Sequence, residues 1–504
     1  MQNRRNFLKK GLGAATVTMV QPVLAARSNE SEPPKQDVDW LRKEENARRI
    51  EFFEPARGAV KNPGMGISAY VHSDHMEPYQ GSNDLKTLDK ATFDRLAVLP
   101  YNDNFYLRLE WRDVQKKKGK LALPDDWKWT MDAVDKYDKR WSFRIMNFMP
   151  QSTSRNGLPE FLQGKFKMIP YHHKEITYGK PPYYYPEYSN DYLNYWDELN
   201  YLLGDAFDDD PRLEFIDVSG YGLWGECHHW HANKLGEPHF SHDPASPERT
   251  DYIVERILQG HLKAYPKTPG ALNMHFAEFK AGLKAFQEGK FWARRDSFME
   301  SFSTHEAEIA QGLHDGCGMA WEAMVIREDG STSFLNDEDF DANKESFLPG
   351  RYFDLAAHYV NIGFSPWTNI WAHENCGKTL NYITESIGYR IRPAIIWRRN
   401  LRNRNELVLG LRNDGSSQVP GTITITAEYA NKAKEAVELP IGQPKPGRLE
   451  LIPISIPDSV DPKSGNATAT LSMKLKMHGK SGAVQWAVRK KNPQQDNYNL
   501  AVKL

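Results

Sequence analysis

Cysteine is scarce in this sequence, and the few cysteines present do not form a recognisable framework. There are three among 504 residues, at Cys227, Cys317 and Cys376. An odd and sparse set is not typical of a disulfide-stabilised domain. The Cys-x-x-Cys pair of structural zinc sites is also missing. We therefore expect neither a disulfide scaffold nor a structural zinc ion.

The sequence also has no surplus charge of either sign. It carries 65 basic and 66 acidic side chains, for a formal net charge of -1. Such a balance does not provide the basic surface that attracts nucleic acid or an anionic membrane. Beyond the N-terminal segment, no apolar run is long enough to cross a bilayer. We expect no nucleic-acid partner, and no membrane insertion once that segment is removed.

The N-terminal segment has the pattern of a secretion signal. The stretch "NRRNFLKKGLGAATVTMVQPVLAA" has paired arginines, Arg4 and Arg5, before a weakly apolar stretch that ends in small residues. It resembles a twin-arginine export signal, and residues 1–26 are expected to be removed. Residues 27–50 are polar and charged and are expected to form a linker. These features predict a protein that is exported and works in the periplasm or outside the cell.

Alternation of short apolar runs with helical patterns predicts the main domain, over residues 51–387. Eight candidate strands alternate with amphipathic stretches such as 189–207 and 246–265, which is the pattern of a (β/α)8, or TIM, barrel. A long insert at 151–188 fits an elaborated loop on the active-site face. The expected strands are 64–71, 104–111, 141–150, 213–222, 270–276, 291–298, 318–324 and 364–371.

The character of the sequence changes at about Gly388. Residues 388–504 contain short alternating runs, such as the Thr-Ile-Thr-Ile-Thr run at 422–426, separated by Gly, Asn, Asp and Pro. This pattern predicts a smaller antiparallel β-sandwich. No acids or histidines are grouped there in a catalytic way, so we expect an accessory domain.

Two glutamates fall at the expected ends of barrel strands. Glu226 follows the fourth strand, in "SGYGLWGECHHWH", and Glu322 ends the seventh, in "GMAWEAM". Catalytic residues of barrel enzymes lie at the C-terminal ends of strands, and glycoside hydrolysis uses a pair of carboxyl groups. The two positions predict a catalytic pair. For Glu322, which lies in an apolar run, the alternative is a structural role as the partner of a buried arginine such as Arg294 or Arg295.

Other polar and aromatic side chains near expected strand ends are candidates for sugar contacts. Aromatic residues make up 12% of the chain, and flat rings suit sugar stacking as well as core packing. Because side chains alternate along a strand, only about half of these candidates face the barrel axis. The candidates are Arg108, Trp111, Asn147, Trp224, His228, Asn273, His275, Arg295, Asp296, Trp321, Trp367 and Trp371.

Four motifs carry a resemblance to a known group of proteins. "NPGMG", "LRLEWRDVQKKKGKL", "FRIM" and "IDVSGYGLWGE" resemble exported bacterial barrel proteins of the beta-galactosidase-like type, similar to clan A and family 42 glycoside hydrolases with a C-terminal β-sandwich. The resemblance spans about residues 60–500. It implies a retaining hydrolase with Glu226 as acid/base and Glu322 as nucleophile. One departure is that Gly225 stands where clan A has an asparagine that contacts the sugar.

The resemblance also suggests a substrate class. Exported barrels of this kind act on β-linked polysaccharides or oligosaccharides, and a galactan is the expected substrate. His172, His173, His228, His229, Arg294 and Arg295 would suit a sulfated galactan of marine type, since arginine binds oxyanions in bidentate fashion. No cofactor is expected.

Two alternatives remain open from the sequence. The first is a metal-dependent hydrolase that uses Glu226, Cys227, His228, His229 and His231, because carboxylate, thiolate and imidazole all bind zinc. Adjacent residues rarely converge on one ion, so we expect no metal site. The second is a glycan-binding barrel that does not cleave its ligand.

Overall fold

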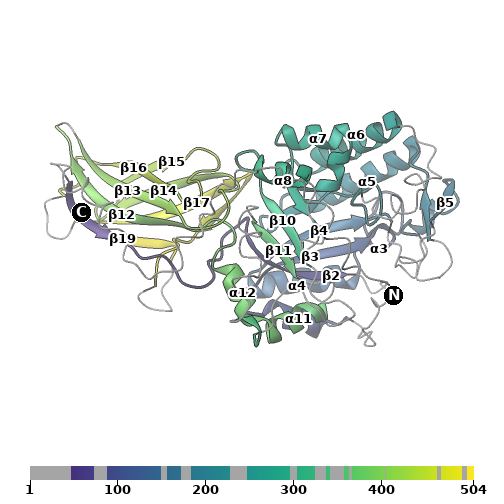
Figure 1. Cartoon of the computed structure of the whole chain (residues 1–504), viewed down its shortest axis with the longest axis horizontal. Helices are drawn as coiled ribbons and strands as arrows, with labels where there is room; N and C mark the ends of the chain where they lie inside the picture. The colour runs from purple at the N-terminus through teal and green to yellow at the C-terminus, as the bar shows by residue number, and fades with distance from the viewer. Residues whose placement is uncertain are drawn as a thin grey trace, which may run out of the picture.

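A computed structural model describes most of the chain after the N-terminal segment. The described residues are 47–72, 88–148, 156–171, 183–227, 247–295, 304–323, 337–340, 357–362, 366–402, 404–462, 467–490 and 497–504. The export signal expected at residues 1–26 and most of the expected linker lie outside this part of the chain. Figure 1 shows a barrel surrounded by helices on the right and a β-sandwich on the left.

Eight parallel strands close into a barrel, as the sequence predicts. Every neighbouring pair in the closed order β10-β11-β2-β3-β4-β7-β8-β9 is parallel. The strands are β2 (Gly66–His72), β3 (Asn102–Glu110), β4 (Arg140–Met146), β7 (Leu213–Asp217), β8 (Gly270–Asn273), β9 (Trp292–Arg295), β10 (Met319–Ala323) and β11 (Tyr359–Ile362).

The prediction for the eighth strand is wrong. Residues 364–371 were expected to be extended, but the eighth strand is β11, and Pro366 begins a helix, α11 (Pro366–Asn375). Proline is favoured at the first helical position because an N–H group at that position would have no hydrogen-bond partner within the helix, so its absence costs nothing. Trp367, Ile370 and Trp371 follow at helical spacing. The two tryptophans therefore lie on a helix that covers the barrel.

Helices surround the barrel and follow local sequence signals. In α5 (Asn190–Phe207), the Ser189 side chain accepts a hydrogen bond from Tyr192 N (3.2 Å) and caps the helix. The buried stripe includes Trp196 and Leu203. The other helical segments are α2 (Lys90–Ala97), α3 (Trp111–Val114), α4 (Asp125–Tyr137), η4 (Glu160–Leu162), α6 (Pro247–Ala264), η5 (Met274–Glu278), α7 (Lys280–Gln287), α8 (Thr304–Gln311) and α12 (Gly377–Thr384).

The insert after the third barrel strand contains its own hairpin. Strands β5 (Met168–Tyr171) and β6 (Tyr183–Pro186) pair antiparallel, before α5 returns to the barrel. In the described part of the insert, Tyr185 and Tyr188 are buried and pack against the barrel.

The sandwich has two antiparallel sheets. One contains β1 (Ala47–Phe52), β12 (Ile391–Asn400), β13 (Asn405–Asn413) and β16 (Leu449–Ile456); the other contains β14 (Thr422–Tyr429), β15 (Lys434–Glu438), β17 (Thr468–Met477), β18 (Lys480–Val484) and β19 (Asn499–Lys503). The sequence placed residues 47–52 partly in a linker and partly in the barrel, but β1 pairs with β12. Every second residue of β14 is buried, as its alternation predicts.

The sandwich lies against the base of the barrel, where the strands begin. Lys480 Nζ donates to Leu213 O (2.9 Å), at the first residue of β7, and to Thr268 Oγ1 (2.6 Å). Gln418 O in the sandwich lies 2.8 Å from His358 Nε2, just before β11. The opposite end of the barrel, where the strands finish, is the end that carries the active site in barrel enzymes.

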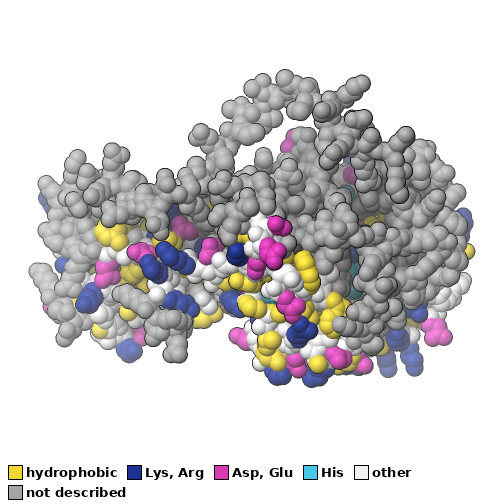
Figure 2. All heavy atoms as spheres, turned by 60° about the horizontal axis from the view of Figure 1, so that its bottom comes forward, with side chains coloured by type: hydrophobic (Ala, Val, Ile, Leu, Met, Phe, Trp, Pro, Cys, Tyr) yellow, Lys and Arg dark blue, Asp and Glu magenta, His cyan; other side chains and the backbone are white. Residues whose placement is uncertain are grey.

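On the face shown in Figure 2, both basic and acidic side chains are visible among the described residues. Among the helices that the structure describes, none is long and apolar enough to cross a membrane.

Candidate active site at the barrel mouth

Glu226 does not stand at a strand end but on a turn that folds back over the barrel. Strand β7 ends at Asp217, and residues 218–227 form this turn. Trp224 N donates to Phe148 O (2.7 Å), and Cys227 N donates to Tyr221 O (2.9 Å). Glu226 is almost completely buried, with 3% of its surface exposed. The turn therefore returns this carboxylate to the barrel interior.

The glycine before Glu226 is required by the backbone. Gly225 has φ +75°, a conformation that side chains disfavour, and a Cβ there would lie 2.7 Å from Ser219 Cβ. An asparagine, as clan A would place here, does not fit this turn. Asn147, directly after β4, instead supports the turn, because its Nδ2 donates to Gly220 O (3.1 Å).

Three arginines from three barrel strands surround Glu226. Arg144 Nη1 donates to Glu226 Oε1, Arg294 Nη1 lies 3.1 Å from it, and Arg108 Nη2 lies 3.5 Å from it. Arg144 and Arg294 are completely buried. Cationic neighbours stabilise a carboxylate relative to the neutral acid, so this surrounding favours the ionised form of Glu226.

A second carboxylate, Asp217, shares two of these arginines. Its Oδ2 atom accepts hydrogen bonds from Arg144 Nη2 (2.5 Å) and from the Tyr106 hydroxyl, and it lies 2.9 Å from Arg294 Nε in an ion pair. Burial opposes ionisation of Arg144, but its anionic neighbours, Asp217 foremost, raise the pKa of its guanidinium well above the usual range. Both arginines thus join Asp217 to Glu226.

Two uncharged side chains of the first barrel strand, Tyr70 and His72, lie next to this cluster. Arg108 Nη1 donates to the Tyr70 hydroxyl, and burial raises the pKa of Tyr70 and Tyr106. Burial and the nearby Arg108 and Arg144 hold the pKa of His72 well below its usual range. His72, the last residue of β2, is therefore uncharged at neutral pH.

Glu322 can be placed by register only. It pairs with Asn361 on β11, and Ala320, two residues earlier, pairs with Arg294 on β9. Alternate residues of a strand share a face, so position 322 belongs to the face that carries Arg294. The side chain of Glu322 lies outside the described part of the chain.

Two predicted contact residues belong to the opposite face of the barrel wall. Trp321 pairs in register with Arg295. Arg295 Nε lies 2.8 Å from Glu306 Oε1 on α8, and Trp321 is completely buried. The structure thus places both side chains between the barrel and its helices rather than at the mouth.

Other predicted residues have structural partners near the mouth. Trp111 starts α3, and its Nε1 donates to Gln115 Oε1 (2.7 Å) while its ring packs edge-on against Trp196. Asn273 caps η5 by accepting from His275 N (3.0 Å). Trp111 and Asn273 are buried, whereas His275 is partly exposed.

The remaining predicted residues divide into two groups. Trp224, Trp367 and Trp371 are half-buried, and Trp224 lies on the turn beside Glu226.

His228 and Asp296 lie outside the described residues, as do His229 and His231 of the metal alternative. Burial raises the pKa of the Cys227 thiol, which opposes the thiolate that binds metal. No group of three His, Cys, Asp or Glu placed to hold a metal ion occurs among the residues that the structure describes.

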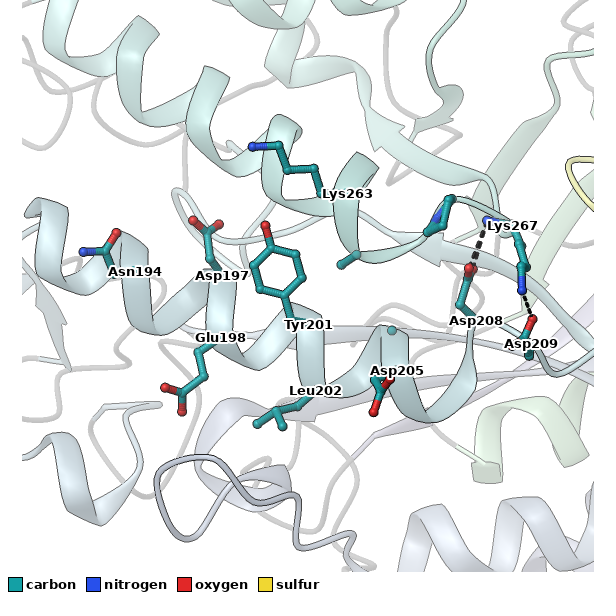
Figure 3. A pocket seen from close by; sticks show the side chains of 13 residues that line it. Asn194, Asp197, Glu198, Tyr201, Leu202, Asp205, Asp208, Asp209, Lys263 and Lys267 are labelled. Carbon is teal, nitrogen blue, oxygen red and sulfur yellow. Dashed lines mark hydrogen bonds and ion pairs between the residues drawn. The ribbon is translucent and has the colours of Figure 1, made fainter.

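A groove on the outer wall of the barrel is separate from this cluster. It has a volume of about 840 Å³ and lies between α5 and α6, with an exposed Tyr201 (Figure 3). Lys267 pairs with Asp209 through Nζ, and its backbone N donates to Asp208 Oδ2 (3.0 Å). No residue of the predicted site lines it.

Sequence reasoning named Glu226 and Arg108 as site residues and Arg294 as a possible sulfate contact, but it did not predict that these residues belong to one charged cluster. Asp217, Arg144 and Tyr106 complete it. A signal was present: each is a polar residue within a short run expected to form a buried barrel strand, where an unpartnered polar group would be costly. Arg294 was noted as a partner for Glu322, whereas its described carboxylate partners are Asp217 and Glu226.

Comparisons with known proteins add little to this geometry. No protein-family model matches the chain, and no curated protein matches it. Three similar solved structures are a GH5_18 protein from Streptomyces cattleya in complex with Manb1-4GlcNAc (13% identity, 54% of this chain and 64% of that chain, TM-score 0.32), endo-glycoceramidase II from Rhodococcus sp. (10%, 79% and 99%, 0.39), and a glycoside hydrolase family 5 enzyme from Prevotella bryantii B14 (10%, 66% and 98%, 0.38). At TM-scores this low the likeness carries no argument about activity, and the strand order itself establishes the barrel.

Proposed function

We propose that this chain is a retaining glycoside hydrolase in which Glu226 and Glu322 form the catalytic carboxyl pair. The observation that carries the proposal is the return of Glu226 to the barrel interior at the C-terminal ends of the strands, in contact with Arg108, Arg144 and Arg294. Position 322 lies on the inward face of the seventh strand. In this proposal Glu226 is the acid/base and Glu322 the nucleophile.

The three arginines oppose one part of the role proposed for Glu226, namely that of general acid. A general acid must hold a proton when the substrate binds, and three cations oppose protonation of Glu226. The same cluster suits an ionised base, which Glu226 must be in the second half of a retaining reaction. The proposal therefore requires that negative charge near the arginines offsets part of their field.

The proposed substrate is a β-linked galactan, neutral or sulfated. Two arginines that would suit sulfate already have internal partners, Arg294 with Asp217 and Glu226, and Arg295 with Glu306. The four histidines of that hypothesis lie outside the described residues. Neutral and sulfated galactans therefore belong in the same experiment.

Product release from a panel of neutral and sulfated galactans tests the proposal. Wild type is compared with Glu226→Gln and Glu322→Gln, and Glu255→Gln on the exposed face of α6 is the matched control. We expect wild type and the control to release sugar, and both site variants to lose about 10²-fold or more of that activity. Full activity of either site variant would contradict the pair.

A glycan-binding barrel without hydrolysis is the second candidate. It is favoured by the three guanidinium groups, which stabilise an ionised Glu226. A galactan that binds wild type in calorimetry, survives prolonged incubation and still binds Glu226→Gln would support this candidate over the hydrolase.

We also propose export through the twin-arginine pathway, based on Arg4, Arg5 and the weakly apolar stretch that follows. Replacing both arginines with lysine is expected to retain the unprocessed chain in the cytoplasm. Cell fractionation with an antibody to the chain measures this. Normal processing and export of that variant would exclude the pathway.

A further inference from the structure

We propose that Asp217 is a positioning residue that offsets the charge of Arg144 and Arg294 and so allows Glu226 to take up and release a proton. This inference rests on the proposed function, because it assigns a role to the proton on Glu226. Asp217 does not act on the substrate itself; it acts through the two guanidinium groups.

The geometry joins the two carboxylates through shared arginines. Arg144 contacts Asp217 through Nη2 and Glu226 through Nη1; Arg294 contacts Asp217 through Nε and Glu226 through Nη1. All four side chains are at least nine-tenths buried. Each arginine is thus held in place by Asp217 from one side and presented to Glu226 on the other.

Only one oxygen of Asp217 makes these contacts. Oδ2 accepts from Arg144 and the Tyr106 hydroxyl and forms an ion pair with Arg294, while Oδ1 is buried and has no hydrogen-bond partner among the described residues. A buried carboxylate oxygen without a partner is costly. An asparagine would keep the acceptor and remove the negative charge, so structure alone does not demand an aspartate here.

The role of Asp217 follows from the net charge of the cluster before and after Glu226 takes up a proton. When Glu226 is ionised, Arg108, Arg144, Arg294, Asp217 and Glu226 carry three positive and two negative charges. Protonation of Glu226 leaves this group with two net positive charges, and without Asp217 it would leave three. Charges interact strongly at such distances in a buried site, so Asp217 lowers the free-energy cost of protonating Glu226.

Cations and uncharged side chains also lie around this cluster in the described part of the chain. From β3, Glu226 faces Arg108, a further cation, while Tyr106 keeps its proton and donates to Asp217. From β2, Tyr70 accepts from Arg108 and packs beside the uncharged His72. Arg144 faces Glu226 from β4 and Arg294 from β9. Asp217 on β7 is a negative charge in direct contact with both Arg144 and Arg294.

Leaving-group dependence tests the inference in the working enzyme. The probes are phenyl β-galactoside, whose poor leaving group needs an acid, and 2,4-dinitrophenyl β-galactoside, whose good leaving group does not. Asp217→Asn is expected to lose about 10²-fold in kcat on the phenyl substrate and much less on the dinitrophenyl substrate. Tyr106→Phe, which removes a hydrogen bond to the same oxygen without changing charge, should leave the ratio of the two rates unchanged.

A charge-restoring variant separates compensation from a structural role. Asp217→Asn combined with Arg144→Gln removes one charge of each sign, and it should bring the ratio of the two rates back toward wild type. Equal losses on both substrates in Asp217→Asn, or no recovery in the double variant, would overturn the inference. Thermal unfolding establishes that each variant is folded, and a variant that fails to fold is replaced by Asp217→Ser.

A measurement without substrate keeps this test independent of the proposed function. Carbon-13 NMR follows protonation of the Glu226 carboxyl group, assigned by its absence from Glu226→Gln. We expect the midpoint of its titration to fall by about one pH unit or more in Asp217→Asn; an unchanged midpoint would overturn the inference. If wild type cuts neither probe, that result counts against the hydrolase, while the titration still decides the role of Asp217.

Discussion

Arg294 Nη1 lies 3.1 Å from Glu226 Oε1, although the two residues belong to a strand and to a turn at different points around the barrel. The guanidinium group is completely buried, and the glutamate is nearly so. This contact ties the turn at 218–227 to the sixth barrel strand. The position of the candidate catalytic carboxylate therefore depends on the charged cluster as much as on its own backbone.

Removing Arg294 should destabilise the fold. Arg294→Met leaves Asp217 and Glu226 with one fewer cation in a buried site, and loss of one partner of a buried pair costs about 3–5 kcal/mol. The matched control is Arg95→Met, whose pair with Glu374 is half-exposed and is expected to contribute about 0–1 kcal/mol. Urea unfolding measures both, and equal small losses would show that the buried cluster is not a stabilising unit.

Trp321 and Trp224 were both predicted to contact sugar, but their substitution should affect stability and KM differently. Trp321 is completely buried in the outer layer, so Trp321→Ala should cost about 3–5 kcal/mol of stability and leave KM near wild type. Trp224 is half-buried on the turn beside Glu226, so Trp224→Ala should raise KM with a smaller loss of stability. Steady-state kinetics with thermal unfolding compares them, and the reverse pattern would contradict the structure.

Because α5 packs closely against α6 at Gly204, replacing this glycine with alanine should lower the stability of the fold. A Cβ at Gly204 would lie 2.0 Å from Ala264 O, so Gly204→Ala should destabilise by about 1–3 kcal/mol despite the higher helix propensity of alanine. Asp205→Ala, at the exposed neighbouring position, is the control and should change stability little. Higher stability of Gly204→Ala would mean that the two helices are not in close contact.

His261 should make the protein sensitive to acid. Burial lowers the pKa of this imidazole to about 4, against about 6.5 in the unfolded chain. Between these values the unfolded state binds more protons, so the free energy of unfolding falls as the pH drops from 6.5 to 4. Relative to His261→Gln, wild type should lose on the order of 3 kcal/mol across this window.

The control for this pH effect is Lys263→Gln, on the exposed face of the same helix. Lysine does not titrate between pH 4 and 6.5, so this variant should follow wild type. Urea unfolding at a series of pH values gives the comparison. Parallel curves for wild type and His261→Gln would mean that the imidazole takes up its proton without unfolding.

The barrel could be predicted from the sequence because its strands and helices carry strong local patterns. The run at 104–111 corresponds to β3, and 189–207 corresponds to α5. The eighth strand could not be located, since β11 has only four residues, whereas the longer aromatic run at 364–371 resembles a strand until Pro366 is considered as a helix start.

The site was only partly predictable, because its geometry depends on contacts between distant segments. The sequence indicated that Glu226 matters and placed it just past the fourth strand, but the turn that returns it to the interior depends on Gly225 and on Asn147, which follows β4. The pairing of Arg144 and Arg294 with Asp217 joins three strands. No spacing within one segment reveals such a contact.

The most direct test of the central claim is the configuration of the product when azide rescues each glutamate variant. Glu226→Ala and Glu322→Ala are incubated with azide and 2,4-dinitrophenyl β-galactoside, and the glycosyl azides are identified by NMR. Loss of the acid/base lets azide attack the glycosyl-enzyme, so Glu226→Ala should give the β-azide; loss of the nucleophile lets azide attack directly, so Glu322→Ala should give the α-azide. The reverse pair of products, or no azide adduct from either variant, would contradict the account.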